Sequence, residues 1–233
     1  MKKYKLDARL AAAAGFARRG KVAADVGTDH AMLPIYLVSE GIAPRAVASD
    51  INPGPLARAK LNISDAGLSD KIETVLTDGL DGLEDSGAED IFILGMGGEL
   101  ISRIVLSSDL PRRPGVRLVM QPMTHAQDLR RDLGAAGFTV IDEALSEDCS
   151  GRIGNGDGRI YQTITAEYTG VVEEYSPEEL VLGRINIARG GELLKKYAAY
   201  LAQVYSVRAA GLEKAGRDAS YEKDLILRLG KIK

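Results

Sequence analysis

The chain of 233 residues is long enough for one α/β domain and a smaller appendage, and its 45% hydrophobic and 27% charged residues are ordinary for a globular protein. It contains no apolar run near the ~18 residues of a membrane span and no signal-peptide core at its start, so we expect no membrane association and a cytoplasmic location. The single cysteine, Cys149, excludes an intramolecular disulfide. With one cysteine and two histidines, we also expect no metal.

Charge is unevenly distributed along the chain. The formal net charge is −3, but residues 177–233 hold 11 basic and 7 acidic side chains, and the first 21 residues are basic too. Both ends could contact a phosphate backbone, with Arg9, Lys195 and Lys196 as the candidates; the alternative is a solvated helix surface.

Short apolar runs alternate with helical patterns, an order typical of a parallel sheet covered by helices. The pattern predicts strands over residues 22–26, 46–49, 72–76, 90–94 and 116–120, and helices over 7–16, 32–40, 53–66, 100–105 and 126–136. Asn52 and Pro53 suit the N-cap and first turn of the third helix. Residues 138–144 and 160–168 follow without a helix between them. They predict a terminal antiparallel hairpin, joined by a glycine-dense loop over residues 151–158 that we expect to be mobile.

The character of the sequence changes after Pro177. Residues 192–214 and 220–229 have helical periodicity, and Gly216 separates them, which predicts a helical hairpin. We expect two domains, 1–170 and 177–233. The expected fold class is α/β, a doubly wound Rossmann-like sheet of the kind typical of class I methyltransferases, followed by the helical hairpin.

The end of the first predicted strand carries the strongest functional signal. It reads Asp25-Val26-Gly27-Thr28-Asp29-His30, and Asp50 lies 25 residues beyond Asp25, at the end of the neighbouring strand, where a carboxylate can bind the ribose hydroxyls of a nucleoside. A pyrophosphate site would need further glycines after Gly27. Asp29 would repel a pyrophosphate and suits a cationic or zwitterionic ligand such as S-adenosylmethionine.

The other strand ends are polar or rich in glycine. Asp78 and Gly79 follow the third strand and could bind an adenine, Gly95-Met96-Gly97 follow the fourth, and Gln121 and His125 follow the fifth. Each signal alone fits an ordinary turn or a helix cap. Because ligands of open α/β sheets bind at the carboxyl ends of the strands, the five ends together indicate a cofactor site.

Several of these segments resemble the TrmK family of bacterial tRNA (adenine-N1) methyltransferases. The matching segments are residues 5–10, 24–30, 33–34, 77–80, 95–98 and 121–122. The resemblance implies S-adenosylmethionine as methyl donor and N1 of adenine 22 in tRNA as the target. The chain departs from the family at Met123, where an asparagine is usual, and in its glycine-rich loop over residues 151–158.

We therefore expect Asp29 to contact the amino group of the target base, with Gln121 and His125 as walls of the catalytic pocket. The expected cofactor-binding residues are Asp25, Gly27, Asp29, His30, Asp50, Ile51, Asp78, Gly79, Gly95, Met96 and Gly97. Two alternatives stay open: a methyltransferase acting on a small molecule, which the acidic sheet domain favours, and a non-catalytic RNA-binding protein that retains the cofactor pocket. The sequence does not fix the oligomeric state, and a monomer is one of the open alternatives.

Overall fold

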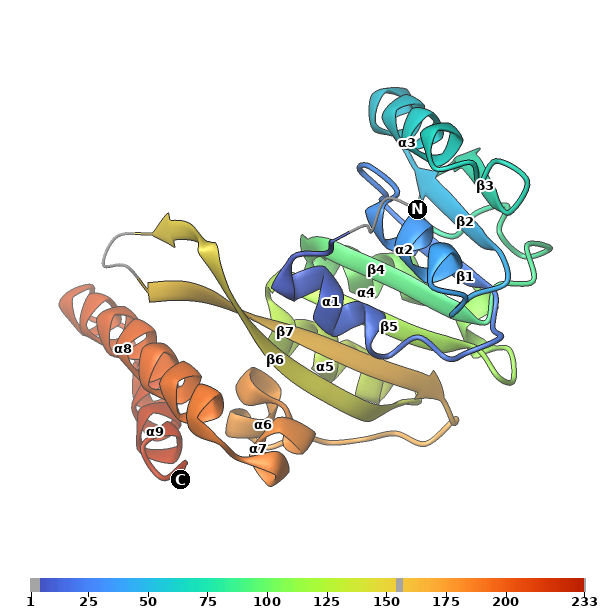
Figure 1. Ribbon diagram of the computed structural model, residues 1–233. Helices are drawn as coiled ribbons and strands as arrows, with labels where there is room; N and C mark the ends of the chain where they lie inside the picture. Colours follow the sequence, from blue (N-terminus) through green and yellow to red (C-terminus); the bar gives the residue numbers. More distant parts are fainter. Residues whose placement is uncertain (1–4, 154–156, 233) are drawn as a thin grey trace. The chain divides into compact units, whose positions relative to one another are not determined.

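Two units divide the chain, Met1–Glu173 and Glu174–Lys233, in a computed structural model that describes residues 5–153 and 157–232 (Figure 1). The described part of the first unit holds a seven-stranded sheet with strand order β3-β2-β1-β4-β5-β7-β6. Its strands are β1 (Ala23–Val26), β2 (Ala46–Asp50), β3 (Ile72–Leu76), β4 (Asp90–Gly97), β5 (Arg117–Thr124), β6 (Phe138–Ile153) and β7 (Asp157–Tyr168). Its helices are α1 (Ala8–Ala14), α2 (Met32–Ser39), α3 (Pro53–Asp65), α4 (Gly98–Leu106), the 3-10 turn η1 (Leu110–Arg112) and α5 (Ala126–Ala135).

The first five strands are parallel, and β7 and β6 complete the sheet as an antiparallel pair. The chain runs outward from β1 to β3 and then returns to the other side of β1 with β4. The strand order therefore reverses between β1 and β4, which is where open α/β sheets bind their ligands. These observations confirm the doubly wound sheet that the sequence predicts.

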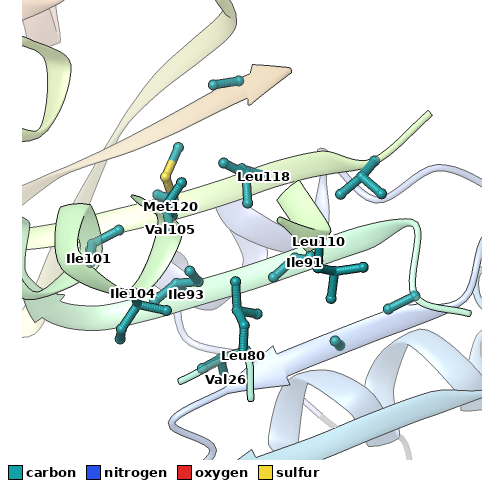
Figure 2. Close-up of a cluster of buried hydrophobic side chains, with 14 of the residues drawn as sticks. Val26, Leu80, Ile91, Ile93, Ile101, Ile104, Val105, Leu110, Leu118 and Met120 are labelled. Carbon is teal, nitrogen blue, oxygen red and sulfur yellow. The ribbon is translucent and has the colours of Figure 1, made fainter. Parts of the chain in front are cut away.

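Each face of the sheet carries its own hydrophobic core. On one face Ile101 and Ile104 of α4 pack against Ile93 and Met120 of the central strands (Figure 2). Leu129 of α5 belongs to the same core. The other face is covered by α1, α2 and α3, whose buried side chains include Ala13, Leu33, Ile35, Ala59 and Ile63. Successive side chains of a strand point to opposite faces. Ala23 and Val119 belong to the core under α1–α3, so Asp25 and Gln121, two positions further along β1 and β5, lie on that same face.

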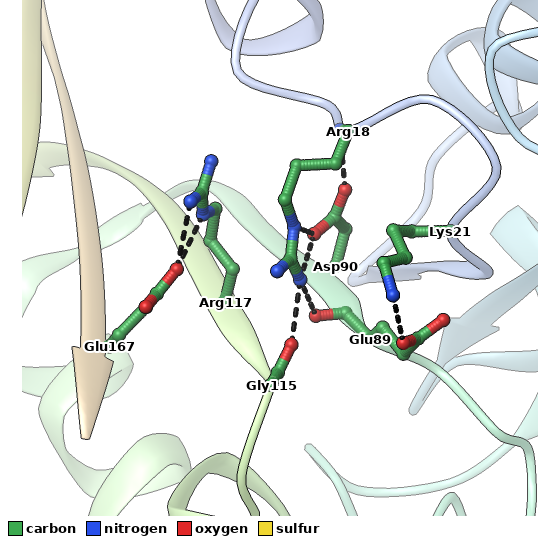
Figure 3. Close-up of polar contacts among 7 residues, drawn as sticks. All are labelled: Arg18, Lys21, Glu89, Asp90, Gly115, Arg117 and Glu167. Atoms are coloured by element: carbon green, nitrogen blue, oxygen red, sulfur yellow. Dashed lines mark hydrogen bonds and ion pairs between the residues drawn. The ribbon is translucent and has the colours of Figure 1, made fainter. Parts of the chain in front are cut away.

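An ion-pair network ties the amino ends of the strands together, opposite to the carboxyl edge. The backbone N and Nε of Arg18 donate to the carboxylate of Asp90 at 2.7 Å, and its Nη2 donates to the carbonyl oxygens of Glu89 and Gly115 at 2.8 Å (Figure 3). Asp90 is buried at the start of β4. This network fixes the segment between α1 and β1 at the amino edge of the sheet.

The β6–β7 hairpin corrects the prediction of a loop over residues 151–158. Strand β6 continues to Ile153 and β7 begins at Asp157, and Ile153 pairs with Asp157 beyond an irregularity in the register, so the strands extend into the expected loop from both sides. We also expect this loop to be mobile, but its residues 154–156 lie outside the described residues, so that expectation stays a prediction. Cross-strand pairing continues here because only a short connection is needed between antiparallel strands.

A buried polar network joins α5 to this hairpin. Arg130 and Glu143 are fully buried; the guanidinium of Arg130 donates to the Glu143 carboxylate at 2.8 and 2.6 Å and to Oε1 of Gln162 at 2.6 Å. A buried charge pair is tolerated only when hydrogen bonds compensate both ions, and this pair has them.

The second unit consists, in its described part, of α6 (Pro177–Leu182), α7 (Arg184–Arg189), α8 (Glu192–Lys214) and α9 (Ser220–Leu229). Ser176 and Glu179 form a capping box at the start of α6. Helices α8 and α9 form the predicted hairpin, which an ion pair between Arg208 and Glu222 joins at 2.9 Å. The bounds of both helices agree with the prediction, whereas α6 and α7 are too short to give a clear periodic signal.

Over residues 5–153 and 157–232, no helix combines the length and the apolar character that a membrane-spanning segment requires.

Candidate functional site

Backbone hydrogen bonds bring the ends of β1, β2 and β3 together. The N–H groups of Gly27 and Thr28 both donate to the carbonyl oxygen of Ser49 at 2.8 Å, and the N–H of Thr77 donates to the carbonyl oxygen of Asp50 at 3.0 Å. The loop after β1 therefore lies against the end of β2, and the segment leading to Asp78 lies beside Asp50. The carboxylate of Asp50 accepts a further bond from the Asn52 N–H at 2.7 Å, which orients it.

Asp25 is a buried acid at the end of β1. Burial is the main influence on it and raises the pKa of its carboxyl group from 3.8 to about 6; a hydrogen bond with Thr28 and the charge of Arg9 act in the opposite direction, and Asp50 adds to the rise. A carboxylate that is shielded from water is strongly stabilised by a cationic partner. Asp25 therefore suits the ammonium group of a ligand.

The glycine and methionine residues after Leu94 belong to β4 and do not follow it, which corrects the predicted end of the strand. The register shifts at Leu94/Met96 and Met96/Gly97 show that this end is irregular. The irregular end lies against the β1 loop: Gly27 has φ +78°, and a Cβ atom there would lie 2.1 Å from Cε of Met96. A side chain at position 27 would have to displace the end of this methionine, so Gly27 and Met96 form one close contact at the switch in strand order.

Gln121 also lies within its strand, because β5 continues to Thr124, and this corrects the prediction that it follows the strand. It is fully buried. Its Oε1 accepts a hydrogen bond from Nη1 of Arg9 at 2.9 Å, and its Nε2 donates to the carbonyl oxygen of Arg9 at 3.4 Å. From its sequence position, Arg9 is expected only as a phosphate contact. Its position in the matching segment 5–10 is the signal that could have linked it to the site.

His125 caps α5 in a left-handed backbone conformation, with φ +57°. Its backbone packs tightly against the start of α4, since a Cβ on Gly98 would lie 2.2 Å from the carbonyl oxygen of His125. Its Nδ1 lies 2.9 Å from a carboxylate oxygen of Asp128 and 3.8 Å from one of Glu99. The left-handed conformation is uncommon outside glycine, and such residues cluster at functional sites.

The three side chains of this His125 cluster bring possible metal-ligand atoms within 4.8 Å of one another. Arg131, however, already forms an ion pair with Asp128. Partial burial favours the neutral acid, but the hydrogen bonds with His125 and Arg131 outweigh it and hold the pKa of Asp128 below its usual value. The negative charge of Asp128 is therefore already compensated by Arg131.

Asp29 and His30 lie in the exposed loop after β1. Oδ2 of Asp29 lies 3.2 Å from Nε2 of His30, and Asn62 of α3 donates to the carbonyl oxygen of His30 at 3.0 Å. Asp29 thus pairs with His30, Gln121 with Arg9, and His125 with Asp128. Among the described residues, the three expected catalytic side chains make no direct contact with one another.

The remaining expected residues lie on the outer part of this edge. Ile51 follows Asp50 with its side chain 58% exposed, and Asp78 is exposed after β3. The edge thus offers two buried carboxylates, a glycine that admits a methionine, and an exposed apolar side chain. These groups fit a nucleoside that carries a cationic amino-acid chain, whereas the negative charge of Asp25 and Asp50 opposes a pyrophosphate. A sheet of this strand order with this edge defines a class I methyltransferase.

Comparison with known proteins agrees with this class and gives the family. The family model described as a methyltransferase domain matches residues 6–153. The tRNA (adenine(22)-N(1))-methyltransferase of Bacillus subtilis (strain 168) is 35% identical over 167 residues, which cover 72% of this chain and 67% of the relative. The chain belongs to the TrmK family of tRNA (adenine(22)-N(1))-methyltransferases and is an enzyme of the methyltransferase class.

Solved structures share the fold over nearly the whole chain. The crystal structure of the B. subtilis TrmK matches with a TM-score of 0.78 and 27% identity, covering 97% of this chain and 95% of that one. A Streptococcus pneumoniae protein solved in complex with S-adenosyl-L-methionine matches with a TM-score of 0.82 and 28% identity, covering 98% and 99% of the two chains.

Proposed function

We propose that this chain transfers the methyl group of S-adenosylmethionine to N1 of adenine 22 in tRNA. The observation that carries the proposal is the carboxyl edge of the sheet, where Asp25, Asp50 and the contact between Gly27 and Met96 meet at the switch in strand order. Membership of the TrmK family supports the same reaction.

The described residues would hold the cofactor along the edge from β3 to β4. The Asp50 carboxylate binds the ribose hydroxyls, and the exposed side chain of Ile51 lies next to it in the chain, where it covers the base. Asp78 and Gly79 bind the adenine. At the other end, Asp25 and Gly27 hold the amino-acid part, and the loop residues Asp29 and His30 close the site. The backbone of β4 approaches the cofactor closely at Gly95 and Gly97 and directs Met96 toward Gly27.

S-adenosylmethionine supplies an electrophilic methyl group on a sulfonium when it is bound. N1 of adenine has a free lone pair at neutral pH, so the protein needs no strong base to start the reaction. As N1 bonds to the methyl carbon, the bond from this carbon to the sulfonium sulfur would break, and S-adenosylhomocysteine would leave as a neutral thioether. Asp29 would accept a hydrogen bond from the amino group of the target base and take its proton as the ring becomes positive. Gln121 and His125 form the walls of the pocket that aligns N1, and this alignment can supply much of the acceleration.

The target base has to leave its stack, which costs a few kcal/mol and needs contacts to the RNA backbone. Lys195 and Lys196 on α8 are the proposed phosphate contacts of the second unit. Lys195 currently pairs with Glu192 at 2.7 Å, and a phosphate would compete for its ammonium group. We place the reaction in the cytoplasm, on tRNA, in an enzyme that uses no metal.

The test is an incubation of the protein with labelled S-adenosylmethionine and unmodified tRNA, with a pool of small metabolites in a parallel reaction. The proposal predicts label in 1-methyladenosine from tRNA. Label in a metabolite would support a small-molecule methyltransferase, and no label in either would support a non-catalytic RNA-binding protein.

A variant tests the role of the β1 loop. Asp29→Ala should lower turnover with tRNA while leaving the unmodified tRNA bound, because Asp29 acts on the base after it is in place. Full turnover by the variant would remove Asp29 from the mechanism.

A further inference from the structure

One cation lies among the acids of the cofactor edge, and the proposed function leaves it without a role there. Nη1 of Arg9 lies 3.4 Å from the position that a Cβ of Gly95 would take, and the same atom donates to Gln121 on the neighbouring strand β5. The charge of Arg9 also acts on Asp25 of β1. The guanidinium of α1 therefore lies over the ends of the three central strands, at the switch in strand order.

Gln121 holds this guanidinium in place. Because Gln121 is fully buried and exchanges two hydrogen bonds with Arg9, it fixes both the side chain and the backbone at the start of α1. Freezing a long arginine side chain loses conformational entropy, which a rigid partner offsets only in part. The guanidinium of Arg9 is therefore preorganised to bind a ligand.

The guanidinium of Arg9 has N–H donors that its contact with Gln121 does not use. Its side chain is 24% exposed, and in the described part of the chain Nε and Nη2 donate no hydrogen bond; the nearest acid, Asp7, lies 3.7 Å from Nη2. Arg9 and Asp25 form no direct ion pair in residues 5–153. A fixed cation and a buried acid thus lie close enough to influence each other without touching.

A cation and an acid so placed match the two charges of an amino acid. The α-ammonium group of the methionine part suits Asp25, and its α-carboxylate then needs a positive partner nearby. Arginine binds carboxylates with two parallel N–H donors, which is the capacity that Arg9 retains.

We propose that Arg9 binds the α-carboxylate of S-adenosylmethionine and that Gln121 is the positioning residue that holds Arg9 for it. The inference rests on the proposed cofactor. It replaces the phosphate contact suggested for Arg9 by sequence position, because the guanidinium is directed at the sheet edge.

The experiment compares three ligands by calorimetry on the full chain: S-adenosylmethionine, its decarboxylated analogue, and 5′-methylthioadenosine, which keeps only the nucleoside end. The wild-type chain should bind S-adenosylmethionine about 10- to 100-fold more tightly than the decarboxylated analogue, the range of hydrogen bonds to a charged group. In Arg9→Met the two affinities should become equal, with 5′-methylthioadenosine unaffected. Gln121→Met should reduce the discrimination in part, since the guanidinium remains but is no longer held.

Arg19→Met is the matched control, because Arg19 is an exposed arginine of the same N-terminal segment. It should keep the wild-type discrimination. The inference is overturned if the wild-type chain binds S-adenosylmethionine and its decarboxylated analogue equally, a result that needs no variant to fold. It is also overturned if Arg9→Met keeps the discrimination and loses only tRNA affinity. If the wild-type chain binds none of the three ligands, the proposed function itself fails.

Discussion

The contact between Gly27 and Met96 can be tested by adding one methyl group. In Gly27→Ala the new Cβ would lie 2.1 Å from Cε of Met96, so the methionine has to move. The moving atom is the end of a flexible side chain, and the packing cost itself is small. The main loss of stability comes from φ +78°, where a residue with a Cβ costs about 1–2 kcal/mol.

Gly20→Ala separates the two effects. Gly20 has φ +81°, but a Cβ there would meet nothing within 4 Å. It should therefore lose the same ~1–2 kcal/mol of stability without displacing any neighbour. A difference in cofactor binding between the two variants then reports the local change at Gly27 and Met96 and not the backbone strain.

The assays are urea unfolding and calorimetric titration with S-adenosylmethionine. Gly27→Ala should bind the cofactor roughly 5- to 30-fold more weakly, which corresponds to about 1–2 kcal/mol, because the new methyl group displaces Met96 beside the amino-acid part of the cofactor. Gly20→Ala should bind as the wild-type chain does. Wild-type affinity in Gly27→Ala would refute the reasoning that this contact belongs to the cofactor site.

Three further predictions concern charge. The pKa of Asp25 is raised from 3.8 to about 6, so the folded state holds the proton more tightly than the unfolded chain does. The free energy of unfolding should therefore fall as the pH rises through this window, by about 3 kcal/mol once the group is ionised. Asp25→Asn should be more stable than the wild-type chain in urea at about pH 8, and an equal difference in stability between the two chains at about pH 4 would contradict this. Charge reversal of Lys195 and Lys196 should weaken tRNA binding and flatten its salt dependence by roughly two phosphate contacts in filter-binding assays, whereas unchanged binding would reject these contacts. Arg18→Met leaves the buried Asp90 carboxylate without its guanidinium and should cost about 3 kcal/mol in urea unfolding; a loss under about 1 kcal/mol, as for an exposed pair, would argue against the role assigned to this network.

Regular periodicity made most of the fold predictable. The strand at Ile72–Leu76 and the helices at Glu192–Lys214 and Ser220–Leu229 have the predicted bounds, because their apolar positions repeat with one clear period. Strands β4 and β5 extend further than predicted. The added residues include Gly95 and Gly97 of β4 and Pro122 of β5, residue types that usually end strands, and the irregular pairing between Met96 and Pro122 tolerates them.

The candidate site divides in the same way. Asp25, Gly27 and Asp50 could be found because a strand end followed by a turn has a local signature. The bond between Arg9 and Gln121 could not, since these residues are 112 positions apart and only the packing of α1 on the sheet brings them together. The same holds for one of the two neighbours of His125. Asp128 is three residues away in the sequence, whereas Glu99 lies on α4 and is brought close only by the fold.

The central claim is methylation of one nitrogen of one nucleotide, and a pair of tRNA transcripts tests it most directly. One transcript carries adenine at position 22 and the other guanine, and both are incubated with the protein and S-adenosylmethionine before nucleoside mass spectrometry. The account predicts one 1-methyladenosine per molecule in the first transcript and none in the second. Equal methylation of both transcripts, or methylation of neither, would contradict it.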